Sequence, residues 1–592
     1  MKLNDLFVRF LKWRANNISD AFFVLVLSVL IGFLSGLAAG LLKYTVISIR
    51  EKLFSYYSDS EQIILLFILP LLGIFLTVIF LKYIIRDNVG HGVPRILYVI
   101  SKLDASMRRH KIFSSLVGGS LTAGFGGSIG LESPIISTGA SLGSTIGQWL
   151  KLGYKHKTLL IGCGAAGAMA SIFTTPIAAV VFGFEVLLLD LSTASLIPLL
   201  ISSVTGAVTT KLLTAEQYLV HFKVSEEFAI QDLPYFIVLG VIAGFVAVYF
   251  HYMHFKIIKF FNRFKSIWLK ALVGGSALGI LVYLFPPLYS EGYESIRTIV
   301  SGNAEELLNY TFLEGSEFYV SLLIFTSLLV VFKVIATTLT TEAGGVGGIF
   351  APAAVMGGFT GFTISRGLNE IFEGLGLHEG NFTLVGMAAV LGGVLMAPLT
   401  AIFLIAEMSN GYELIVPLML ATAIAYLIAK TFNKHSIFTQ SLAEGGFLFQ
   451  FRDKTVLNQL KIRELLEEDV ITVSINSTLG ALVEQIKVSK RNFFAAIDEQ
   501  GTFIGMILLD DVRKDMFNHE KYDEPISDYL HIMMSDEKVS VDTDVQDIVN
   551  KFNKTNNYNM VVVDGNKYVG IVSRANLLKA YRDSMISNDE KY

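Results

Sequence analysis

The sequence predicts an α-helical polytopic membrane protein with an internal, inverted-topology repeat and broken helices, followed by a smaller α/β unit. Composition is the first reason, because 53% of the 592 residues are hydrophobic and the mean hydropathy is +0.56. The second reason is a glycine-rich segment that occurs twice in the apolar region. The third is a change to frequent charges and short apolar runs after about residue 450.

Apolar blocks without Asp, Glu, Lys or Arg recur along the first three quarters of the chain. A helix needs about 20 such residues to cross a bilayer. Several blocks are shorter or are interrupted by Gly and Pro, which suits half-length helices buried in protein. The blocks are 21–42, 62–81, 158–184, 191–210, 233–255, 271–290, 318–332, 343–365, 381–406 and 414–429.

The repeat is visible in two pairs of segments. Segment 120–139 matches segment 338–357 when 218 is added, and segment 175–185 matches segment 397–407 at an offset of 222. Two matches in one order, differing by a four-residue shift, indicate an internal duplication. We therefore divide the chain into 1–18, an N-terminal amphipathic helix; 19–225, the first membrane repeat; 226–445, the second; and 446–592, a cytoplasmic unit.

Glu132 is the one carboxylate in the first glycine-rich segment, and its equivalent in the second is Phe350. In transporters built from repeats, helices broken by Gly and Pro present their N-terminal amides to the substrate near the bilayer midplane. Such an end attracts negative charge, so we expect an anion as substrate, with Glu132 as a tethered competitor. The alternative is that the glycines allow close helix packing and Glu132 lies at a wet helix end.

Charge and cysteine content exclude several other classes. Basic residues precede the first apolar block, which predicts a cytoplasmic N-terminus. We expect an integral protein of a bacterial inner membrane, surrounded by lipid, with both termini in the cytoplasm. Nothing supports nucleic-acid binding, and the single Cys163 allows neither a disulfide nor a cysteine metal site. Glu132 alone cannot supply the several oxygen ligands of a Mg²⁺ pathway. No nucleophile and base pair is visible, so we expect no enzyme activity and no required cofactor.

Two similar units follow, at about 455–520 and 521–585, each with the pattern of a strand, a helix, a hairpin and a second helix. They resemble a pair of CBS domains. Ser573 and Asn576 look like that family's ribose-contacting signature, and the first unit keeps only Asp511 of it. Two interpretations stay open, an adenine-nucleotide site and a dimerisation platform in which Ser573 caps a helix.

The membrane region resembles the CLC family of chloride channels and anion/proton antiporters. Three family phrases appear in order at residues 90–94, 130–134 and 348–352, reading GHGVP, GLESP and GIFAP. The resemblance implies a homodimer with one pore in each subunit and Glu132 as the gating glutamate. It also implies anion binding by backbone amides, at Ile349 and Phe350 for a central anion and at Gly130, Leu131 and Ser133 for an outer one.

Two departures from the family pattern concern the central anion site. His91 replaces the family's serine, and Phe438 falls where a tyrosine hydroxyl is expected. A histidine is neutral or cationic near neutral pH, so the site could prefer another anion or respond to pH. The alternative is that His91 only packs, while backbone amides alone bind the ion.

A third departure concerns protons. The inner proton glutamate of the family's antiporters falls at Val186, which cannot relay a proton, and Leu131 replaces an arginine beside the gate. These residues favour passive, gated conduction, with chloride as the ion. The alternative is a proton-coupled exchanger of altered selectivity, for fluoride, nitrate or bicarbonate. Glu185 and Glu407, at equivalent repeat positions, are expected to serve helix ends and subunit packing.

Overall fold

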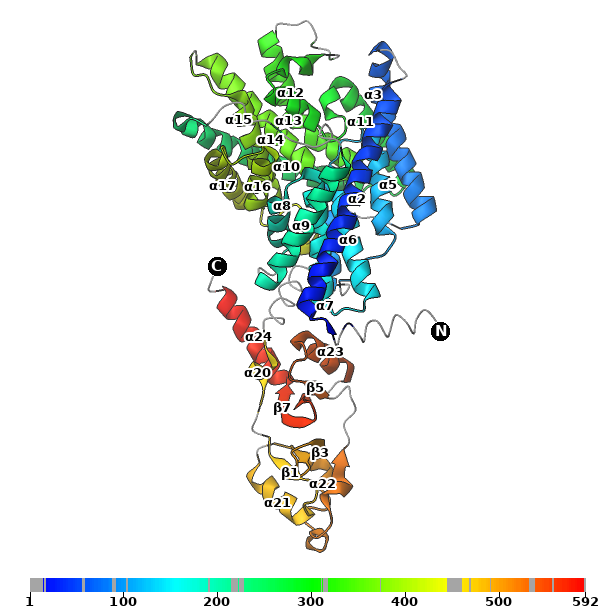
Figure 1. Cartoon of the computed structure of the whole chain (residues 1–592), viewed down its shortest axis with the longest axis vertical. Coiled ribbons are helices and arrows are strands. Elements are labelled where there is room, and N and C mark those ends of the chain that lie inside the picture. Colours follow the sequence, from blue (N-terminus) through cyan, green and yellow to red (C-terminus); the bar gives the residue numbers. More distant parts are fainter. Residues whose placement is uncertain are drawn as a thin grey trace. The chain divides into compact units, whose positions relative to one another are not determined.

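The computed structural model divides the chain into two compact units, residues 1–445 and 446–592, which we describe separately (Figure 1). The helix expected over residues 1–18 lies almost entirely outside the described part, as do His91 and the expected repeat boundary at residue 225. The described residues are 14, 17–55, 59–87, 92–102, 105–189, 192–214, 222, 228–309, 311, 313, 318–372, 374–444, 460–467, 470–489, 491–531, 538–555 and 558–589.

The first unit is helical throughout its described residues, and seven of its helices are long and apolar enough to cross a membrane. This confirms the predicted fold class. The first half contains α2 (Asp20–Phe54), α3 (Asp59–Ile79) with a π-helical end η1 (Phe80–Ile85), α4 (Gly92–Lys102), α5 (Lys111–Gly124), α6 (Glu132–Trp149), α7 (Tyr154–Phe173), α8 (Pro176–Glu185) and α9 (Thr193–Leu213).

The second half repeats this series. Its helices α13 to α17 correspond to α5 to α9 at the offsets found in the sequence. The elements are η3 (Ile230–Asp232), α10 (Leu233–Phe261), α11 (Ile267–Leu284), η4 (Pro286–Leu288), α12 (Tyr293–Val300), η5 (Ala304–Leu308), α13 (Phe318–Glu342), α14 (Phe350–Ile371), α15 (Glu379–Leu395), α16 (Pro398–Met408), α17 (Ile415–Phe432) and α18 (Gln440–Glu444).

Two long apolar blocks break into a longer and a shorter helix at equivalent places. Block 158–184 becomes α7 and α8, and block 381–406 becomes α15 and α16. In each case a residue in the left-handed conformation, Thr174 or Met396, ends the first helix, and a proline opens the second. Proline suits the first turn because its missing N–H would have no partner there. These two breaks produce the short helices α8 and α16.

Two other blocks end earlier than their helices. Lys43 closes the block 21–42, yet α2 continues to Phe54, and Lys333 closes the block 318–332, yet α13 continues to Glu342. Both lysine side chains are buried, at 5% and 0% exposure. A buried ammonium group does not end a helix when neighbouring carboxylates and polar atoms compensate its charge. The uncharged blocks at these two places are therefore shorter than the helices that contain them.

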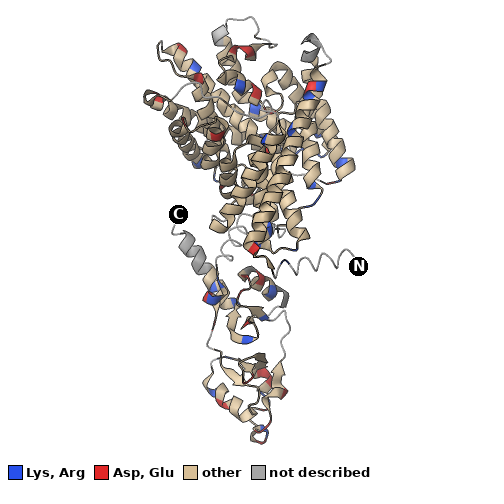
Figure 2. Ribbon diagram, in the orientation of Figure 1, with Lys and Arg blue, Asp and Glu red and all other residues tan. Residues whose placement is uncertain are grey.

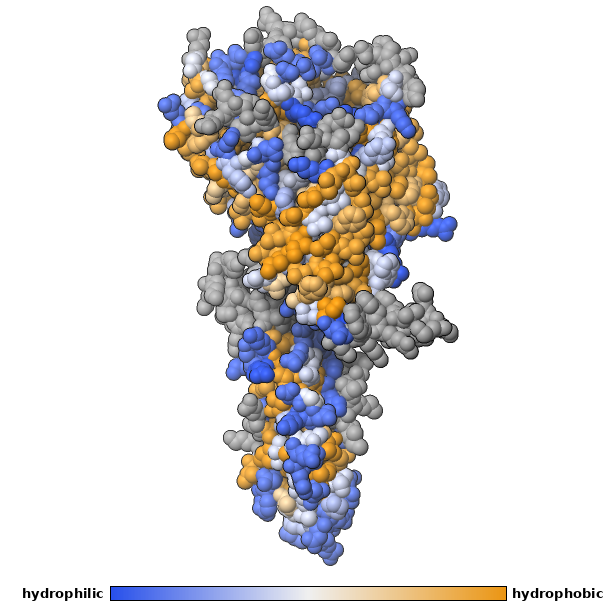
Figure 3. All heavy atoms as spheres, in the orientation of Figure 1, coloured by the Kyte–Doolittle hydropathy of each residue, from blue (hydrophilic) through white to orange (hydrophobic). Residues whose placement is uncertain are grey.

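Close glycine contacts join the helices within each half. The carbonyl of Gly164 on α7 lies 2.1 Å from the place where a Cβ on Gly139 of α6 would lie. The equivalent pair in α14 and α15, Gly357 and the carbonyl of Gly386, gives 2.2 Å. Any side chain at Gly139 or Gly357 would push the helices apart. The outer surface is hydrophobic over α2 and α9 (Figure 3), and charged residues are sparse along the helices (Figure 2).

The second unit contains two similar α/β cores, as predicted. In the first, β1 runs parallel to β2, and β2, β3 and β4 are antiparallel neighbours; in the second, β5 runs parallel to β6, and β6 is antiparallel to β7. The elements are α20 (Ile462–Leu465), β1 (Thr472–Ser474), α21 (Leu479–Val488), β2 (Phe493–Ile497), β3 (Phe503–Leu508), α22 (Leu509–Val512), η6 (His519–Lys521), η7 (Ile526–Tyr529), β4 (Leu530–His531), β5 (Lys538–Ser540), α23 (Val545–Thr555), β6 (Asn559–Asp564), β7 (Lys567–Ser573) and α24 (Arg574–Asp589).

Helix α20 links the two cores. Although it precedes the first core in sequence, its residues Ile462 and Leu465 pack in the second core, against Phe552 and Leu577. A further cluster, which includes Ala495 and Ile571, buries apolar surface between the two sheets. The two cores are therefore packed as one unit, because the chain crosses between them before and after the first sheet.

Candidate anion-binding site

The two glycine-rich segments meet. The N–H of Gly130 donates to the carbonyl of Gly348 at 2.9 Å, and the N–H of Gly348 donates to the carbonyl of Gly130 at 2.9 Å. These residues are equivalent in the repeat. The α6 helix begins at Glu132 and α14 at Phe350, two residues after each glycine, so the reciprocal bonds hold the two helix N-termini beside each other.

Threonines from opposite halves fix the turns that lead to these helices. The N–H of Ser128 donates to Oγ1 of Thr340 at 3.2 Å, and the N–H of Val346 donates to Oγ1 of Thr122 at 3.0 Å. Thr122 and Thr340 are again equivalent positions. In each turn, a buried backbone N–H therefore donates to a threonine hydroxyl of the other repeat. One repeat on its own would leave this N–H without an acceptor.

Residues from the first and third of the three family motifs lie against Ser133, which belongs to the second. A Cβ at Gly92, the first residue of α4, would lie 2.9 Å from the Cβ of Ser133, and a Cβ at Gly348 would lie 2.6 Å from it. The structure therefore brings together Gly130, Leu131, Ser133, Ile349 and Phe350, the residues expected to bind an outer and a central anion. Phe438 is buried in the turn before α18, which packs against α4.

Glu132 is buried at 1% exposure in the first turn of α6. Its Oε1 accepts a hydrogen bond from the Tyr293 hydroxyl at 3.3 Å, and its Oε2 has no hydrogen-bond partner among the described residues. Oε2 lies 1.9 Å from the place where a Cβ on Gly130 would lie. The carboxylate is therefore folded over the reciprocal hydrogen bonds between Gly130 and Gly348, which we call the glycine bridge. It occupies space that only a glycine at position 130 leaves open.

A chain of three aromatic rings begins at the tyrosine that holds this carboxylate. Tyr293 meets Phe173 edge to face at 6.1 Å between ring centroids, and Phe173 lies 5.9 Å from Phe350. All three rings are largely withdrawn from solvent. Phe350 opens α14, so one continuous aromatic contact runs from the partner of Glu132 to the second helix N-terminus.

The sequence interpretation missed three charged residues near this site. The N–H of Leu131 donates to Oε1 of Glu291 at 3.4 Å. Nζ of Lys333 donates to Oγ of Ser128 at 3.1 Å and to the carbonyl of Ser290 at 3.3 Å. Lys43 is the third.

A signal for these residues was present. Lys43, Glu291 and Lys333 are the charges at which three uncharged blocks stop, and they served only as block boundaries. Their burial depends on helices from distant parts of the chain, which a sequence pattern does not bring together.

Glu185 and Glu407 serve helix ends, as expected. The carboxylate of Glu185, the last residue of α8, accepts from the N–H groups of Leu399 and Thr400 in the first turn of α16, at 3.1 and 2.7 Å. The carboxylate of Glu407 on α16 accepts from the N–H groups of Ile177 and Ala178 in the first turn of α8, at 3.1 and 2.8 Å. Val186, which follows Glu185 in the sequence, is buried at 6% exposure.

In the CBS pair, Ser573 and Asn576 are engaged by the protein itself. The Ser573 hydroxyl donates to Glu467, and the Asn576 side-chain amide donates to the carbonyl of Leu465 at 3.0 Å. Arg491 pairs with the same Glu467 at 2.6 Å. The N–H of Asn576 donates to Ser573 Oγ at 3.1 Å, which is the expected capping contact, and Asp511 is exposed on α22.

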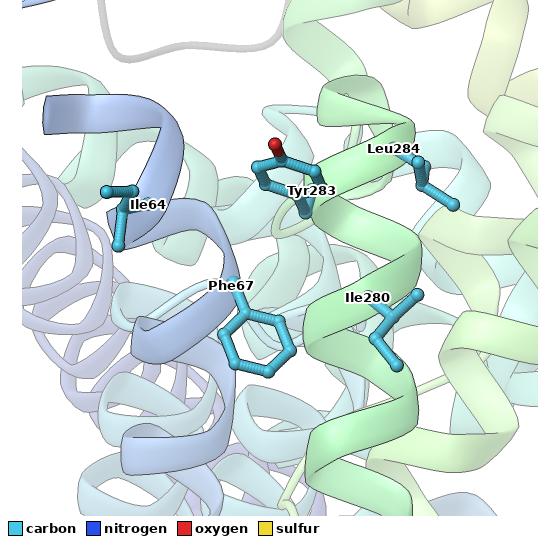
Figure 4. Close-up of a pocket in the computed structure, with 5 residues that line it drawn as sticks. All are labelled: Ile64, Phe67, Ile280, Tyr283 and Leu284. Atoms are coloured by element: carbon cyan, nitrogen blue, oxygen red, sulfur yellow. The ribbon is translucent and has the colours of Figure 1, made fainter. Parts of the chain in front are cut away.

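A separate hollow of about 440 Å³ lies between α3 and α11, and its residues have a different chemistry (Figure 4). Ile64 and Phe67 line it from α3, and Ile280, Tyr283 and Leu284 line it from α11. None of the described residues that line this hollow is charged, so an anion would find no compensating charge among them. The helix N-termini around Glu132 are the better candidate for the anion site.

Fold and site together define a polytopic membrane protein in which helix N-termini from two related halves meet beside a buried carboxylate. Residues 72–430 match the family described as voltage gated chloride channel, and residues 462–518 and 526–583 match the CBS domain. The chain therefore belongs to the voltage gated chloride channel family, the CLC family, and carries a CBS pair. It is an integral membrane protein of a family of anion transporters and channels.

Similar proteins support this assignment. A protein named ClcB-like from Ralstonia nicotianae is 29% identical over 328 residues, which are 54% of this chain and 72% of that protein. The H(+)/Cl(-) exchange transporter ClcA of Vibrio cholerae is 26% identical over 438 residues, which are 71% of this chain and 89% of that transporter.

Solved structures share the fold. A slow cyanobacterial Cl-/H+ antiporter aligns with a TM-score of 0.60 at 23% identity, covering 72% of this chain and 99% of that one. A CLC-type fluoride/proton antiporter aligns with a TM-score of 0.55 at 24% identity, covering 70% and 97%. A eukaryotic CLC transporter gives a TM-score of 0.58 at 18% identity, covering 94% and 99%.

Proposed function

We propose that this protein conducts chloride passively through a pathway gated by Glu132. The observation that carries the proposal is the position of this carboxylate, which is buried at the N-terminus of α6 with one oxygen unpartnered among the described residues. A free anion would gain from the same helix ends. Backbone amides of Gly130, Leu131 and Ser133 would hold an outer anion, and those of Ile349 and Phe350 a central one.

Passive conduction is preferred because the described residues near the inner proton position offer no free carboxylate. Val186 cannot carry a proton, and the carboxylate of its neighbour Glu185 is occupied in capping α16. An acidic group committed to two amides is poorly placed to relay protons.

The alternative is proton-coupled exchange of fluoride, nitrate or bicarbonate. Several similar proteins carry names of exchangers or antiporters, and His91 and Phe438 replace two hydroxyl donors of the family. Replacing His91 by serine restores one donor. If the His91→Ser variant keeps the anion preference and pH dependence of the natural protein, this alternative loses its basis.

We further propose a homodimer with one pathway in each subunit, located in a bacterial inner membrane with both termini in the cytoplasm. The CBS pair would act on gating, either as a dimerisation platform or as an adenine-nucleotide sensor. The engaged side chains of Ser573 and Asn576 favour the platform.

One flux experiment separates the two transport mechanisms. The purified protein is reconstituted into chloride-loaded liposomes, chloride efflux is started with a potassium ionophore, and the external pH is recorded at the same time. We expect chloride to leave without proton movement in the opposite direction. A fixed ratio of protons to chloride would overturn passive conduction, and protein-free liposomes give the background. Replacing chloride by fluoride, nitrate or bicarbonate gives the selectivity.

A further inference from the structure

A second carboxylate reaches the N-terminus of α6. Glu291 lies in the loop that precedes α12, and its Oε1 accepts a hydrogen bond from the N–H of Leu131 at 3.4 Å. Leu131 is the N-cap residue of α6 and directly precedes Glu132. The N–H groups in the first turn of a helix have no partner within the helix, so they are the donors that an anion would use. Glu291 takes one of them.

Two buried lysines accompany this second carboxylate. Lys43 on α2 is 5% exposed, its ammonium has no hydrogen-bond partner among the described residues, and it lies within electrostatic range of Glu291 and Glu132. Lys333 on α13 is fully buried and lies within electrostatic range of Glu291. The Glu291 and Glu132 carboxylates also interact with each other.

Within the set of Lys43, Lys333, Glu291 and Glu132, two positive side chains face two negative ones when both lysines are protonated and both carboxylates are ionised. A buried charge without compensation is costly. If one carboxylate leaves the site or gains a proton, the lysines and the Leu131 amide are left with excess positive charge. The cheapest way to restore the balance is a small anion from solution.

We propose that Glu291 is a second gating carboxylate, which competes with the transported anion for the Leu131 amide and the Lys43 and Lys333 ammonium groups. The inference rests on the anion pathway proposed above. In this arrangement the Glu132 carboxylate covers the glycine bridge, and the Glu291 carboxylate occupies the N–H of Leu131, the residue between Gly130 and Glu132. Anion entry therefore requires the displacement or protonation of two carboxylates.

Helices α2 and α12 bring other ionisable groups near Glu291. From α2, Arg50 is also within its electrostatic range and pairs with the exposed Glu294 at 2.7 Å. From α12, Tyr293 donates to Glu132, and Arg297 lies near Lys43. Among the described groups that interact with Glu291, Glu132 is the other carboxylate. External pH can therefore act on the site through these two carboxylates and through the ammonium groups of Lys43 and Lys333.

The test is a set of variants in the liposome assay, with chloride flux measured at external pH values from acidic to alkaline. The variants are Glu132→Gln, Glu291→Gln, the double variant, and Glu294→Gln as a matched control from the same segment. We expect Glu291→Gln to increase flux severalfold at alkaline pH. We expect Glu132→Gln to keep part of the pH dependence, the double variant to lose it, and Glu294→Gln to behave like the natural protein.

The outcomes separate this inference from the proposed function. If the natural protein carries no anion, the proposed function fails. If it carries chloride while Glu291→Gln leaves flux and pH profile unchanged, or the double variant matches Glu132→Gln, only the second gate is refuted. Should Glu291→Gln not yield monodisperse protein, Glu291→Asp decides the question, because it keeps the charge but is one methylene too short to reach Leu131. Increased alkaline flux in that variant supports the gate, and unchanged flux overturns it.

Discussion

Glu185 and Glu407 each cap the helix at whose C-terminal end the other lies. The two residues are equivalent in the repeat, and so are the amides that they accept from, at positions 177 and 178 and at 399 and 400. The duplication has thus kept a reciprocal contact. An isolated half would contain one carboxylate and one helix N-terminus that cannot meet. The contact forms only when two halves pack together, and it explains acidic residues in an apolar region without a transport role.

The reciprocal caps predict similar losses of stability from either side. Glu407→Ala leaves two amides at the start of α8 without acceptors, and Glu185→Ala does the same for α16. Loss of a helix N-terminal cap costs about 0.5–2 kcal/mol, so we expect each variant to unfold at a clearly lower temperature in detergent. Glu413→Ala, at an exposed site after α16, is the control and should change little. A loss in only one of the two caps would contradict the symmetry.

The second prediction concerns the glycine under the gate. Gly130→Ala places a methyl group 1.9 Å from the present position of Glu132 Oε2, so the carboxylate has to move. We expect the variant to fold and to show a higher chloride flux than the natural protein at alkaline pH, because the displaced carboxylate no longer covers the bridge. Gly153→Ala is the control, since Gly153 has a φ of −65° and nothing within 4 Å of an added Cβ. Equal flux in both variants would mean that the carboxylate does not block the pathway.

The glycine bridge also shows how far sequence reasoning could reach. The repeat offset made Gly130 and Gly348 equivalent, and the helix-end argument predicted an anion beside both. The structure shows that the two turns meet, and the anion itself stays a prediction. Tyr293 and Glu291 could not be predicted, because they follow an apolar block and belong to no repeated phrase. Their roles depend on a loop that returns to α6 from 160 residues away, as the spacing of Leu131 and Glu291 shows. His91 lies outside the described residues, so its part in the site stays a prediction.

The third prediction concerns the hydroxyl that holds the gate. Tyr293→Phe removes the hydrogen bond to Glu132 Oε1 while keeping the ring contact with Phe173. A hydrogen bond to a charged group is worth about 1.5–3 kcal/mol, so the carboxylate should leave its position more readily and flux should rise severalfold. Tyr289→Phe is the matched comparison, because its hydroxyl donates to the Gly124 carbonyl and does not touch Glu132. A rise in both variants would point to general loosening instead of gate release.

The last prediction concerns the CBS pair. Glu467 accepts from the Ser573 hydroxyl and pairs with Arg491, so a carboxylate lies where the ribose signature would present a free hydroxyl. A negative charge there repels phosphate, and we expect calorimetry of the full chain to show no saturable heat with ATP, ADP or AMP. Glu467→Gln removes that charge and should allow measurable AMP binding, whereas Glu499→Gln, on the exposed hairpin turn of the first core, should not. Saturable binding to the natural chain would show that Glu467 moves aside and that the pair is a nucleotide sensor, because only release of Ser573 gives the ribose its hydroxyl.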